Sequence, residues 1–242
     1  MEEAVRRVEI VRAFGNGTFE RRTDEVLEEK ALVLELDGRQ EASVILTPGF
    51  EKEWAIGHLA CRGLIRSIGG LAGVSMEEGQ IRVTRIPTAQ TPLPRDGTVF
   101  LPLEWDMPLK TVLEAVDSLS EGPLFRRTGS AHVALLASVC GKSRFLAEDA
   151  GRHNAIDKAV GMALLGGQDL SNCFLALSGR LPSDMVEKAA RAGIPLVASV
   201  SAATAGGVDA ALRWKITLIG FARGGRANVY TFPERVSGVA SS

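Results

Sequence analysis

The sequence predicts an α/β protein built around a parallel β-sheet, because strand-like and helix-like segments alternate along its last third. The alternation consists of apolar strands at 174–177, 195–200 and 216–219 and amphipathic helices at 183–192 and 203–214. Short strands separated by helices are typical of β-α-β units, whose strands pair in parallel. The carboxyl ends of these strands are therefore expected to meet at one edge of the sheet.

A second observation is a run of charged residues at 148–158, which reads Glu-Asp-Ala-Gly-Arg-His-Asn-Ala-Ile-Asp-Lys. A strand-like segment at 144–147 precedes the run, and Ile156, Val160 and Leu164 continue it at helical spacing. The run therefore falls at the carboxyl end of a strand and on the first turn of a helix. Open α/β sheets bind ligands at such places, so the run indicates a binding site.

Within this run, His153 and Asp157 are four residues apart and share a helical face with Ile156 and Val160. The spacing predicts a His–Asp pair that points inward. The pair can serve a site, since histidine titrates near neutral pH, or it can be an internal hydrogen bond that only stabilises the helix. The density of charge around it favours the first interpretation.

The N-terminal part of the chain, residues 1–97, predicts a smaller α+β portion. No regular element is predicted for residues 1–30, which are rich in charge. The elements predicted after them are strands at 31–36 and 42–46 joined by a hairpin turn at Asp37-Gly38, a turn at Thr47-Pro48-Gly49, a helix at 51–65 and a strand at 81–86. Residues 87–97 contain three prolines and predict a linker to a C-terminal domain at 98–242.

Four elements are predicted between this linker and the charged run. They are a short strand at 99–101, a helix at 109–119, and strands at 132–138 and 144–147 that flank a turn at Cys140-Gly141-Lys142. If the strand at 144–147 belongs to the parallel sheet, the charged run joins the loops that follow the other strands.

The composition is that of an ordinary globular protein of 242 residues, with 45% apolar and 24% charged residues. A net charge of −1 and a pI near 6.3 give no argument for nucleic-acid binding. No apolar run has membrane-spanning length, and residues 1–12 lack the apolar segment of a secretory signal. The cysteines are few and far apart, so we expect a cytoplasmic protein without disulfides, and no metal-ligand spacing is found.

We call the edge where the strands are expected to end the crest. Its predicted loops are the charged run at 148–158 and residues 178–180, 199–204 and 220–226. Glycines let a ligand approach the backbone, and Ser201 and Thr204 lie where a helix N-terminus offers N–H groups to an anion. Phe221 can stack on a flat ring. Three arginines can bind phosphate oxygens through paired N–H groups: Arg180, Arg223 and Arg226.

The crest loops therefore predict a site for a phosphate-bearing heterocycle. The alternative is that small residues in these loops are simply good turn formers. For a single loop that alternative is preferred, but four loops at one edge, each with an arginine or a hydroxyl, favour a site. A lone histidine, His132, is more often packed than functional, although it can also face the crest.

The three cysteines differ in their expected surroundings. Cys61 falls within the predicted helix at 51–65, and Cys173 begins a buried strand, so both are expected to be core residues. Cys140 lies in a turn beside Lys142, and a nearby cation can lower the pKa of a thiol. Cys140 is thus the candidate reactive cysteine, with an ordinary surface turn as the alternative.

Several of these motifs occur together in one known family. They are Thr128-Gly129 through His132, the run at 148–158, Ser178-Gly179-Arg180, Ser201-x-x-Thr204, Gly220-Phe221-x-Arg223, and Thr47-Pro48-Gly49 followed by a Gly-x-Leu helix. Over about residues 28–235 the chain resembles the FdhD/NarQ family of formate dehydrogenase accessory proteins. The resemblance implies a three-layer α/β/α sandwich similar to that of cytidine deaminases, and a homodimer.

The resemblance also implies a function. Members of the family are sulfur carriers that take persulfide sulfur from a cysteine desulfurase. They deliver it to the molybdenum bis(molybdopterin guanine dinucleotide) cofactor of formate dehydrogenase, and their cofactor-contacting loop corresponds to Phe221–Arg226. The cofactor has guanine rings and pyrophosphates, in agreement with the crest prediction. The residues expected to bind it are His132, Glu148, Asp149, Arg152, His153, Asn154, Asp157, Lys158, Ser178, Gly179, Arg180, Ser201, Thr204, Phe221, Ala222, Arg223, Gly224, Gly225 and Arg226.

The chain departs from the family pattern at one critical place. The family's persulfide cysteines lie in a Cys-Gly-x-Cys loop before the Thr-Gly-x-x-His segment, whereas residues 98–107 here contain no cysteine. Since a thiolate is needed to carry sulfane sulfur, three interpretations stay open. The protein is a sulfur carrier that uses another cysteine, with Cys140 as the candidate; or a cofactor-binding chaperone that transfers no sulfur; or a hydrolase or deaminase that uses His153 and Asp157, for which zinc ligands are lacking.

Overall fold

The computed structural model describes residues 2–87 and 106–239 of the chain. Its centre is a six-stranded sheet with the order β13-β12-β11-β10-β8-β9. The strands are β8 (His132–Ser138), β9 (Arg144–Asp149), β10 (Cys173–Leu177), β11 (Leu196–Ser199), β12 (Thr217–Arg223) and β13 (Arg226–Val229). The strands β10, β11 and β12 are parallel, as predicted. Because β8 is antiparallel to both β10 and β9, β9 points the same way as the parallel strands.

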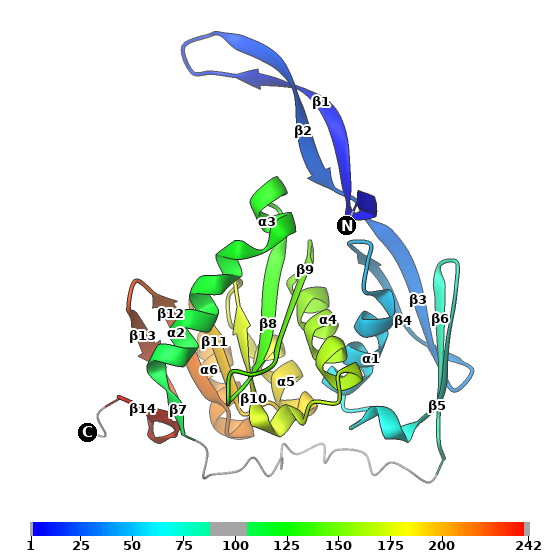
Figure 1. Cartoon of the computed structure of the whole chain (residues 1–242), viewed down its shortest axis with the longest axis vertical. Coiled ribbons are helices and arrows are strands. Elements are labelled where there is room, and N and C mark those ends of the chain that lie inside the picture. The colour runs from blue at the N-terminus through cyan, green and yellow to red at the C-terminus, as the bar shows by residue number, and fades with distance from the viewer. Residues whose placement is uncertain (1, 88–105, 240–242) are drawn as a thin grey trace.

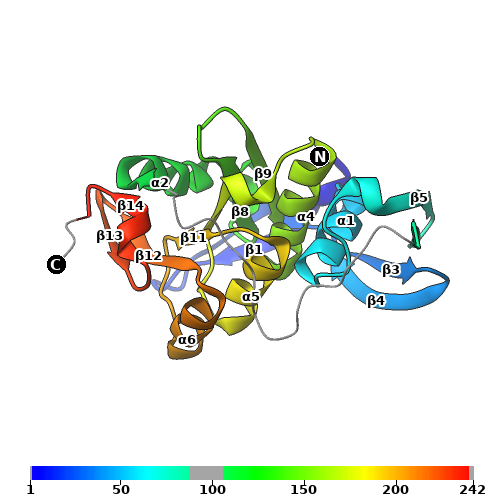
Figure 2. The same ribbon diagram turned by 90° about the horizontal axis from the view of Figure 1, so that it is seen from below.

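Helices cover both faces of this sheet and give a three-layer α/β/α arrangement (Figures 1 and 2). The helix α2 (Leu109–Asp117) packs on one face, and α4 (Arg152–Leu165), α5 (Ser183–Ala192) and α6 (Ala205–Trp214) belong to the core on the other face. Side chains alternate along β10: Phe174 and Ala176 face α2, whereas Leu175 and Leu177 face the opposite core. A strand covered on both faces needs apolar residues at every position, and all five residues of β10 are buried.

A second sheet of four strands lies on the far side of α4 and α1 (Figure 1). Its elements are β3 (Lys30–Leu36), β4 (Arg39–Leu46), β5 (Leu71–Glu77) and β6 (Gln80–Arg85), and α1 (Glu51–Cys61) covers its inner face. One continuous apolar core joins this sheet, α1, α4 and the central sheet. A Cβ on Gly57 would overlap the carbonyl oxygen of Asp157, and one on Gly161 would overlap that of Glu53. Glycine at both positions is thus what lets α1 and α4 cross in contact.

The N-terminal hairpin formed by β1 (Val5–Ala13) and β2 (Phe19–Leu27) stands away from the body of the molecule (Figure 1). We call it the arm. It is attached beside α3 (Pro123–Thr128), where Leu27 packs with Leu124. The remaining elements are a pair of short strands, β7 (Met107–Pro108) and β14 (Val236–Ser237), and 3-10 turns at Glu2–Ala4, Ile68–Gly70, Ser118–Glu121, Leu170–Asn172 and Pro233–Arg235.

Most of the predicted elements are confirmed, with boundaries that shift by a few residues. The helix at 183–192 is α5, and it ends at Gly193 with a left-handed φ of +84°, as a glycine cap should. The prediction for residues 1–30 was wrong, since most of them form the arm and the start of β3. Five further strands and helices were not predicted: β5, β7, α3, β13 and β14. The strand predicted at 99–101, the linker beyond residue 87 and the boundary between 97 and 98 lie outside the described residues.

Candidate functional site

The crest exists as predicted. The strands β9, β10, β11 and β12 all end at one edge of the central sheet, and β8 begins there, so His132 pairs with Asp149. The crest faces the same side of the molecule as the arm (Figure 1). The strand at 144–147 therefore belongs to the sheet, and the charged run lies beside the other crest loops.

Hydrogen bonds hold the crest loops against one another. Ser199 donates its hydroxyl to the carbonyl oxygen of Gly179 at 2.6 Å. The backbone N–H of Phe221 donates to the carbonyl oxygen of Ser201 at 2.9 Å. Ser178 accepts the backbone N–H of Val133 at 2.9 Å. Since each bond links residues of neighbouring strands or of the loops that follow them, the crest is one connected surface.

A small pocket opens in the middle of this surface, lined by His132, Arg152, Gly179 and Arg180 among others. A Cβ on Gly179 would lie 3.5 Å from Nδ1 of His132 and 3.6 Å from Cδ of Arg152. The Nε of Arg152 is buried and has no hydrogen-bond partner among the described residues. Burial, with the Arg152 charge as a second cause, lowers the pKa of His132. The pocket thus offers a donor that lacks an acceptor, which suits an anionic ligand.

Residues 221–226 differ from the prediction in their backbone. They were predicted as a loop, but Phe221–Arg223 continue β12 and turn at Gly224-Gly225 into β13. Phe221 has a φ of +51° at a shift in the β12–β13 register, and 36% of its surface is exposed. The guanidinium of Arg223 lies 5.8 Å from the centre of the Phe221 ring. A non-glycine residue in this region of φ is strained, and such strain is concentrated at functional sites.

Thr204 and Ser201 have local backbone roles. Thr204 is the N-cap of α6, and its hydroxyl accepts the N–H of Gly207 at 3.1 Å. The N–H of Ser201 donates to the hydroxyl of Ser199 at 3.0 Å. Two of the predicted anion-binding groups therefore already have partners within the protein, while Thr204 itself stays exposed at the crest.

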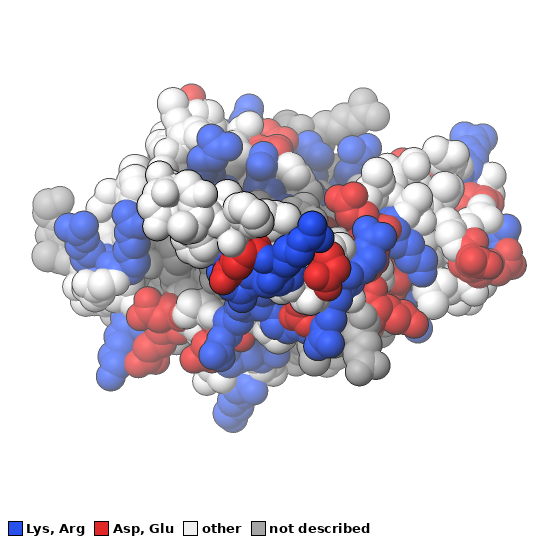
Figure 3. All heavy atoms as spheres, turned by 90° about the horizontal axis from the view of Figure 1, so that it is seen from above, with Lys and Arg blue, Asp and Glu red and all other residues white. Residues whose placement is uncertain are grey.

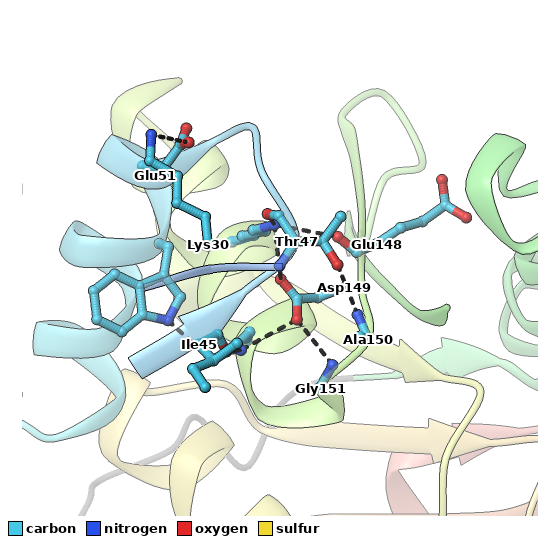
Figure 4. Close-up of polar contacts among 11 residues, drawn as sticks. Lys30, Ile45, Thr47, Glu51, Glu148, Asp149, Ala150 and Gly151 are labelled. Atoms are coloured by element: carbon cyan, nitrogen blue, oxygen red, sulfur yellow. Dashed lines mark hydrogen bonds and ion pairs between the residues drawn. The ribbon is translucent and has the colours of Figure 1, made fainter. Parts of the chain in front are cut away.

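The charged run holds a buried ionic network instead of a uniformly open site (Figure 4). Lys158 forms an ion pair with Asp149 at 2.8 Å, and their side chains are 1% and 0% exposed. Lys158 also donates to the carbonyl oxygen of Thr47 at 2.6 Å, and Asp149 accepts the N–H groups of Thr47 and Gly151 at 3.0 and 2.8 Å. These contacts tie the turn after β4 to the end of β9.

Asn154 and Glu148 complete this network. Asn154 accepts from the indole N–H of Trp54 at 3.2 Å and donates to the carbonyl oxygen of Ile45 at 2.9 Å. Glu148 accepts the N–H groups of Leu124 and Phe125 at 3.0 and 2.7 Å, at the start of α3. Both side chains are buried and paired, so in this structure they support the crest from below.

The predicted pair of His153 and Asp157 was wrong. His153 instead contacts Asp184 at 2.7 Å through Nε2, and its side chain is 42% exposed. Asp157 points the other way and contacts Nδ1 of His58 at 3.2 Å and Nζ of Lys188 at 2.5 Å. Burial alone would raise the pKa of Asp157, but Lys188 and His58 outweigh it and lower that pKa. Helical spacing placed the two residues near one another, but each has a closer partner from another element.

Five residues whose side chains contact the charged run were not predicted: Thr47, Trp54, His58, Asp184 and Lys188. The first three come from the N-terminal portion and contact the charged run across about a hundred residues of sequence. No local pattern reveals such a contact. The sequence did contain a hint of Asp184. It is an acidic residue in the first turn of α5, shortly after the crest loop at 178–180.

The cysteines lie away from the crest. Cys140 is exposed in the β8–β9 turn, at the opposite end of these strands from His132 and Asp149. A hydrogen bond with the Ser138 hydroxyl, and then the backbone N–H of Lys142, lower its thiol pKa. Cys61 and Cys173 are buried, and burial raises the pKa of Cys61 well above its usual value and that of Cys173 to about 12. Their burial agrees with the prediction that both are core residues.

The family profile, the related sequences and a solved structure all point to the same family. The profile of the FdhD/NarQ family matches residues 96–237. The sulfur carrier protein FdhD of Anaeromyxobacter dehalogenans is 34% identical over 88% of both chains, and that of Sulfurisphaera tokodaii is 33% identical over 96% of this chain and 99% of its own. A crystal structure from Desulfotalea psychrophila, described as a candidate formate dehydrogenase accessory protein, superposes with a TM-score of 0.83 at 27% identity over 96% of this chain and 99% of its own.

In the part of the chain described here, no helix has the length and apolar character to span a bilayer.

Proposed function

Since the chain belongs to the FdhD/NarQ family, we propose that it serves the maturation of a formate dehydrogenase by binding the enzyme's molybdenum bis(molybdopterin guanine dinucleotide) cofactor at the crest. The cofactor is the cargo in this proposal. Its guanosine diphosphate parts supply two groups that the crest residues can recognise, a flat base and a pyrophosphate.

The observation that carries the proposal is the buried Nε of Arg152, a residue that lines the crest pocket, because this Nε has no hydrogen-bond partner within residues 2–87 and 106–239. A buried donor without an acceptor costs about 1–3 kcal/mol, more when charged, and a phosphate oxygen in the pocket would remove that cost. Arg180, Arg223 and Arg226 are exposed on the same surface. Gly179 keeps the surface beside His132 and Arg152 open, because a Cβ there would lie in contact with both side chains.

The strained Phe221 adds a second support. Its ring is exposed at the crest, with the Arg223 guanidinium over it. A base stacked on this ring would place its diphosphate toward the arginines of the neighbouring loops. Stacking of a base on an aromatic ring contributes about 1–3 kcal/mol.

The sulfur-transfer step is the finer part of the proposal. As a sulfur carrier of this family, the chain would receive persulfide sulfur from a cysteine desulfurase on one of its own thiols. Cys140 is the exposed cysteine with a lowered pKa, so it is the residue proposed for that role. A thiolate is stronger as a sulfur acceptor than a thiol, and Cys61 and Cys173 are buried with raised pKa values.

A second candidate function is a chaperone that binds the cofactor and transfers no sulfur. The position of Cys140 favours it, because this thiol lies at the opposite end of β8 and β9 from the crest. Sulfur loaded on Cys140 could not reach a cofactor held at the crest of the same molecule. The two candidates share the crest site and differ only in the use of a thiol.

Calorimetric titration of GDP tests the shared part of the proposal. We expect saturable binding to the wild-type protein and a loss of about 1.5–3 kcal/mol in the Arg223→Ala variant, since a charged hydrogen bond contributes that much. Arg39→Ala is the matched control, because Arg39 is an exposed arginine at the far end of β4. Equal affinities in the three proteins would remove the Phe221–Arg226 segment from the site.

A further inference from the structure

A cavity lies between the two portions of the chain, at the end of the central sheet opposite to the crest. Its volume is about 370 Å³, within the range of about 300–1,000 Å³ that small-molecule sites occupy. Its described walls are residues 65–68, which follow α1, the end of α4 with the turn at 167–171, and residues 191–193 at the end of α5. We call this cavity the basal pocket.

The basal pocket is separate from the crest. The helix α4 begins at the crest with Arg152 and reaches the pocket at Leu164. Its 14 residues rise about 1.5 Å each, so the two places are about 20 Å apart. Figure 3 shows the side of the molecule that carries the arm, where acidic and basic side chains lie next to one another, whereas the basal pocket lies at the other end of α4. A ligand in this pocket would therefore not touch a cofactor held at the crest.

The floor of the basal pocket is apolar. It consists of the buried side chains of Ile65, Leu164 and Leu170, which belong to the main core. Ile68 also lines the pocket, and 40% of its surface is exposed. Removing apolar surface from water is favourable in proportion to the area that is covered. The pocket thus favours a ligand with an apolar body.

Two guanidinium groups lie beside this apolar floor. Arg66 is exposed and forms no ion pair with any residue of 2–87 or 106–239. Arg191 pairs with Glu187 at 3.3 Å, and both side chains are partly exposed. Such a surface pair is weak, because water screens it. Both arginines can therefore bind a carboxylate, whose two oxygens match the paired N–H groups of a guanidinium.

The acid at the pocket is already used by the protein. Among the described lining residues, Asp169 has the one carboxylate. Its Oδ1 accepts from the backbone N–H and the hydroxyl of Ser171 at 3.0 and 2.7 Å, and its Oδ2 accepts from Nδ2 of Asn172 at 2.9 Å. Asp169 thus holds the turn before β10 and is not paired with either arginine.

The ends of α4 and α5 also meet at the pocket, and the free carbonyl groups of a helix end would repel an anion. Here the carbonyl of Leu164 accepts the N–H of Gly167 at 3.0 Å, and that of Ala190 accepts the N–H of Gly193 at 2.9 Å. Both glycines have a left-handed φ, +73° and +84°, as in helix ends whose last carbonyls are satisfied by the following turn. The positive charge of the two arginines is therefore not cancelled by unpaired carbonyls of these turns.

We propose that the basal pocket binds a small organic anion with an apolar body, whose carboxylate is held by Arg66 and Arg191. The apolar part of this ligand covers the floor of the pocket. Residues 65–68 belong to the N-terminal portion, and the other walls belong to the portion that carries the central sheet. The ligand thus contacts both portions at once. This site does not depend on the function proposed for the crest.

Calorimetric titration of octanoate into the full-length protein tests the proposal, with 1-octanol as an uncharged ligand of the same chain length. We expect octanoate to saturate one site and 1-octanol to bind about tenfold more weakly or less, because the alcohol lacks the charged hydrogen bonds to the arginines. An excess of GDP should leave the octanoate affinity unchanged. The absence of saturable octanoate binding, equal affinities for acid and alcohol, or displacement of octanoate by GDP would each overturn the proposal.

Two double variants locate the bound carboxylate. Arg66→Gln/Arg191→Gln removes both guanidinium groups of the pocket, whereas Arg62→Gln/Arg213→Gln removes two exposed arginines that are not among its described lining residues. The control is matched, because Arg62 is one turn of chain before Arg66, and Arg213 pairs with Glu187 at 3.2 Å as Arg191 does. We expect the first variant to bind octanoate about tenfold more weakly and the control to bind it like the wild type. Equal affinities in the two double variants would place octanoate elsewhere and contradict the assignment.

A single substitution at Ile68 tests the pocket from its apolar side. Ile68→Glu removes apolar surface and adds a carboxylate that competes with the ligand for the arginines, so octanoate should bind about tenfold more weakly. Met76→Glu is the control, because Met76 is a similarly exposed apolar residue of β5 that is not among the described lining residues. The same loss of affinity in both variants would show that octanoate does not occupy the basal pocket.

Discussion

Two sets of residues in the run at 148–158 have opposite surroundings. The inward set has buried side chains with partners inside the protein: Glu148, Asp149, Asn154, Asp157 and Lys158. The outward set, Arg152 and His153, reaches the crest, where one has an unpaired buried Nε and the other is partly exposed. A dense charged motif therefore serves two purposes, since most of it joins the two portions of the chain and a small part faces the ligand site.

This difference separates stability from binding in a way that can be measured. Substitutions in the inward set should lower the free energy of unfolding, because they leave buried charges without partners. Substitutions in the outward set should weaken ligand binding and leave folding unchanged. The following experiments compare the two sets in order of expected effect.

The largest effect is expected for Lys158→Met. The substitution keeps the length of the side chain but leaves the Asp149 carboxylate buried without its cation. We expect a loss of about 3–5 kcal/mol in the free energy of unfolding, measured by urea denaturation. Lys142→Met, in the exposed β8–β9 turn, is the control. A loss below about 1 kcal/mol, the scale of a surface ion pair, would contradict the assignment of this pair to the core.

Arg152→Ala should affect binding instead. It removes an Nε donor that has no hydrogen-bond partner in the described part of the chain, so the free energy of unfolding should not fall. The affinity for GDP should fall by about 1.5–3 kcal/mol if the guanidinium binds a phosphate oxygen. Calorimetry and urea denaturation on the same sample measure both quantities. A variant that loses stability but binds GDP normally would move Arg152 into the inward set.

A smaller effect is expected from the pH dependence of His132. Its pKa is lowered in the folded protein, so the folded state prefers the neutral ring. The resulting stability is complete above the unfolded pKa of about 6.5 and is lost as the pH falls from there through the folded pKa. His132→Gln should therefore lose less stability than the wild type when denaturation is compared at about pH 7 and pH 5.5. An equal loss of unfolding free energy in both proteins between these two pH values would exclude His132 as a source of the pH dependence.

Cys140→Ala should have no effect on GDP affinity, because Cys140 lies at the opposite end of the sheet from the crest. The same variant separates the two candidate functions. A sulfur carrier that uses this thiol would lose its ability to accept persulfide sulfur, detected by mass spectrometry after incubation with a cysteine desulfurase and cysteine. A chaperone would show no sulfur adduct on the wild type either. Weakened GDP binding by Cys140→Ala would contradict the separation of thiol and crest.

The sequence was sufficient to predict five of the six strands of the central sheet, all except β13, and the location of the crest. Strand and helix alternation placed β10, α5, β11, α6 and β12, and a glycine with left-handed φ closed α5 where expected. These features depend on local patterns, which a single sequence contains. The arm was missed because its charged strands have no buried face to produce a regular alternation of apolar residues.

The site was predicted in location but not in the roles of its residues. Helical spacing cannot show that Asp157 contacts His58, or that Asp149 accepts from Thr47, because these partners lie about a hundred residues away. Those contacts exist because α1 crosses α4 at two glycines and brings the N-terminal portion against the charged run. Only the three-dimensional packing separates the inward set from the outward set.

Hydrogen–deuterium exchange with and without GDP tests the central claim, that the crest is the ligand site, most directly. We expect slower exchange in peptides that cover residues 178–182, 200–207 and 220–226, and no change in the β8–β9 turn at residues 139–143. Protection confined to the turn, or no protection anywhere despite saturating GDP, would contradict the claim and leave the crest without a ligand.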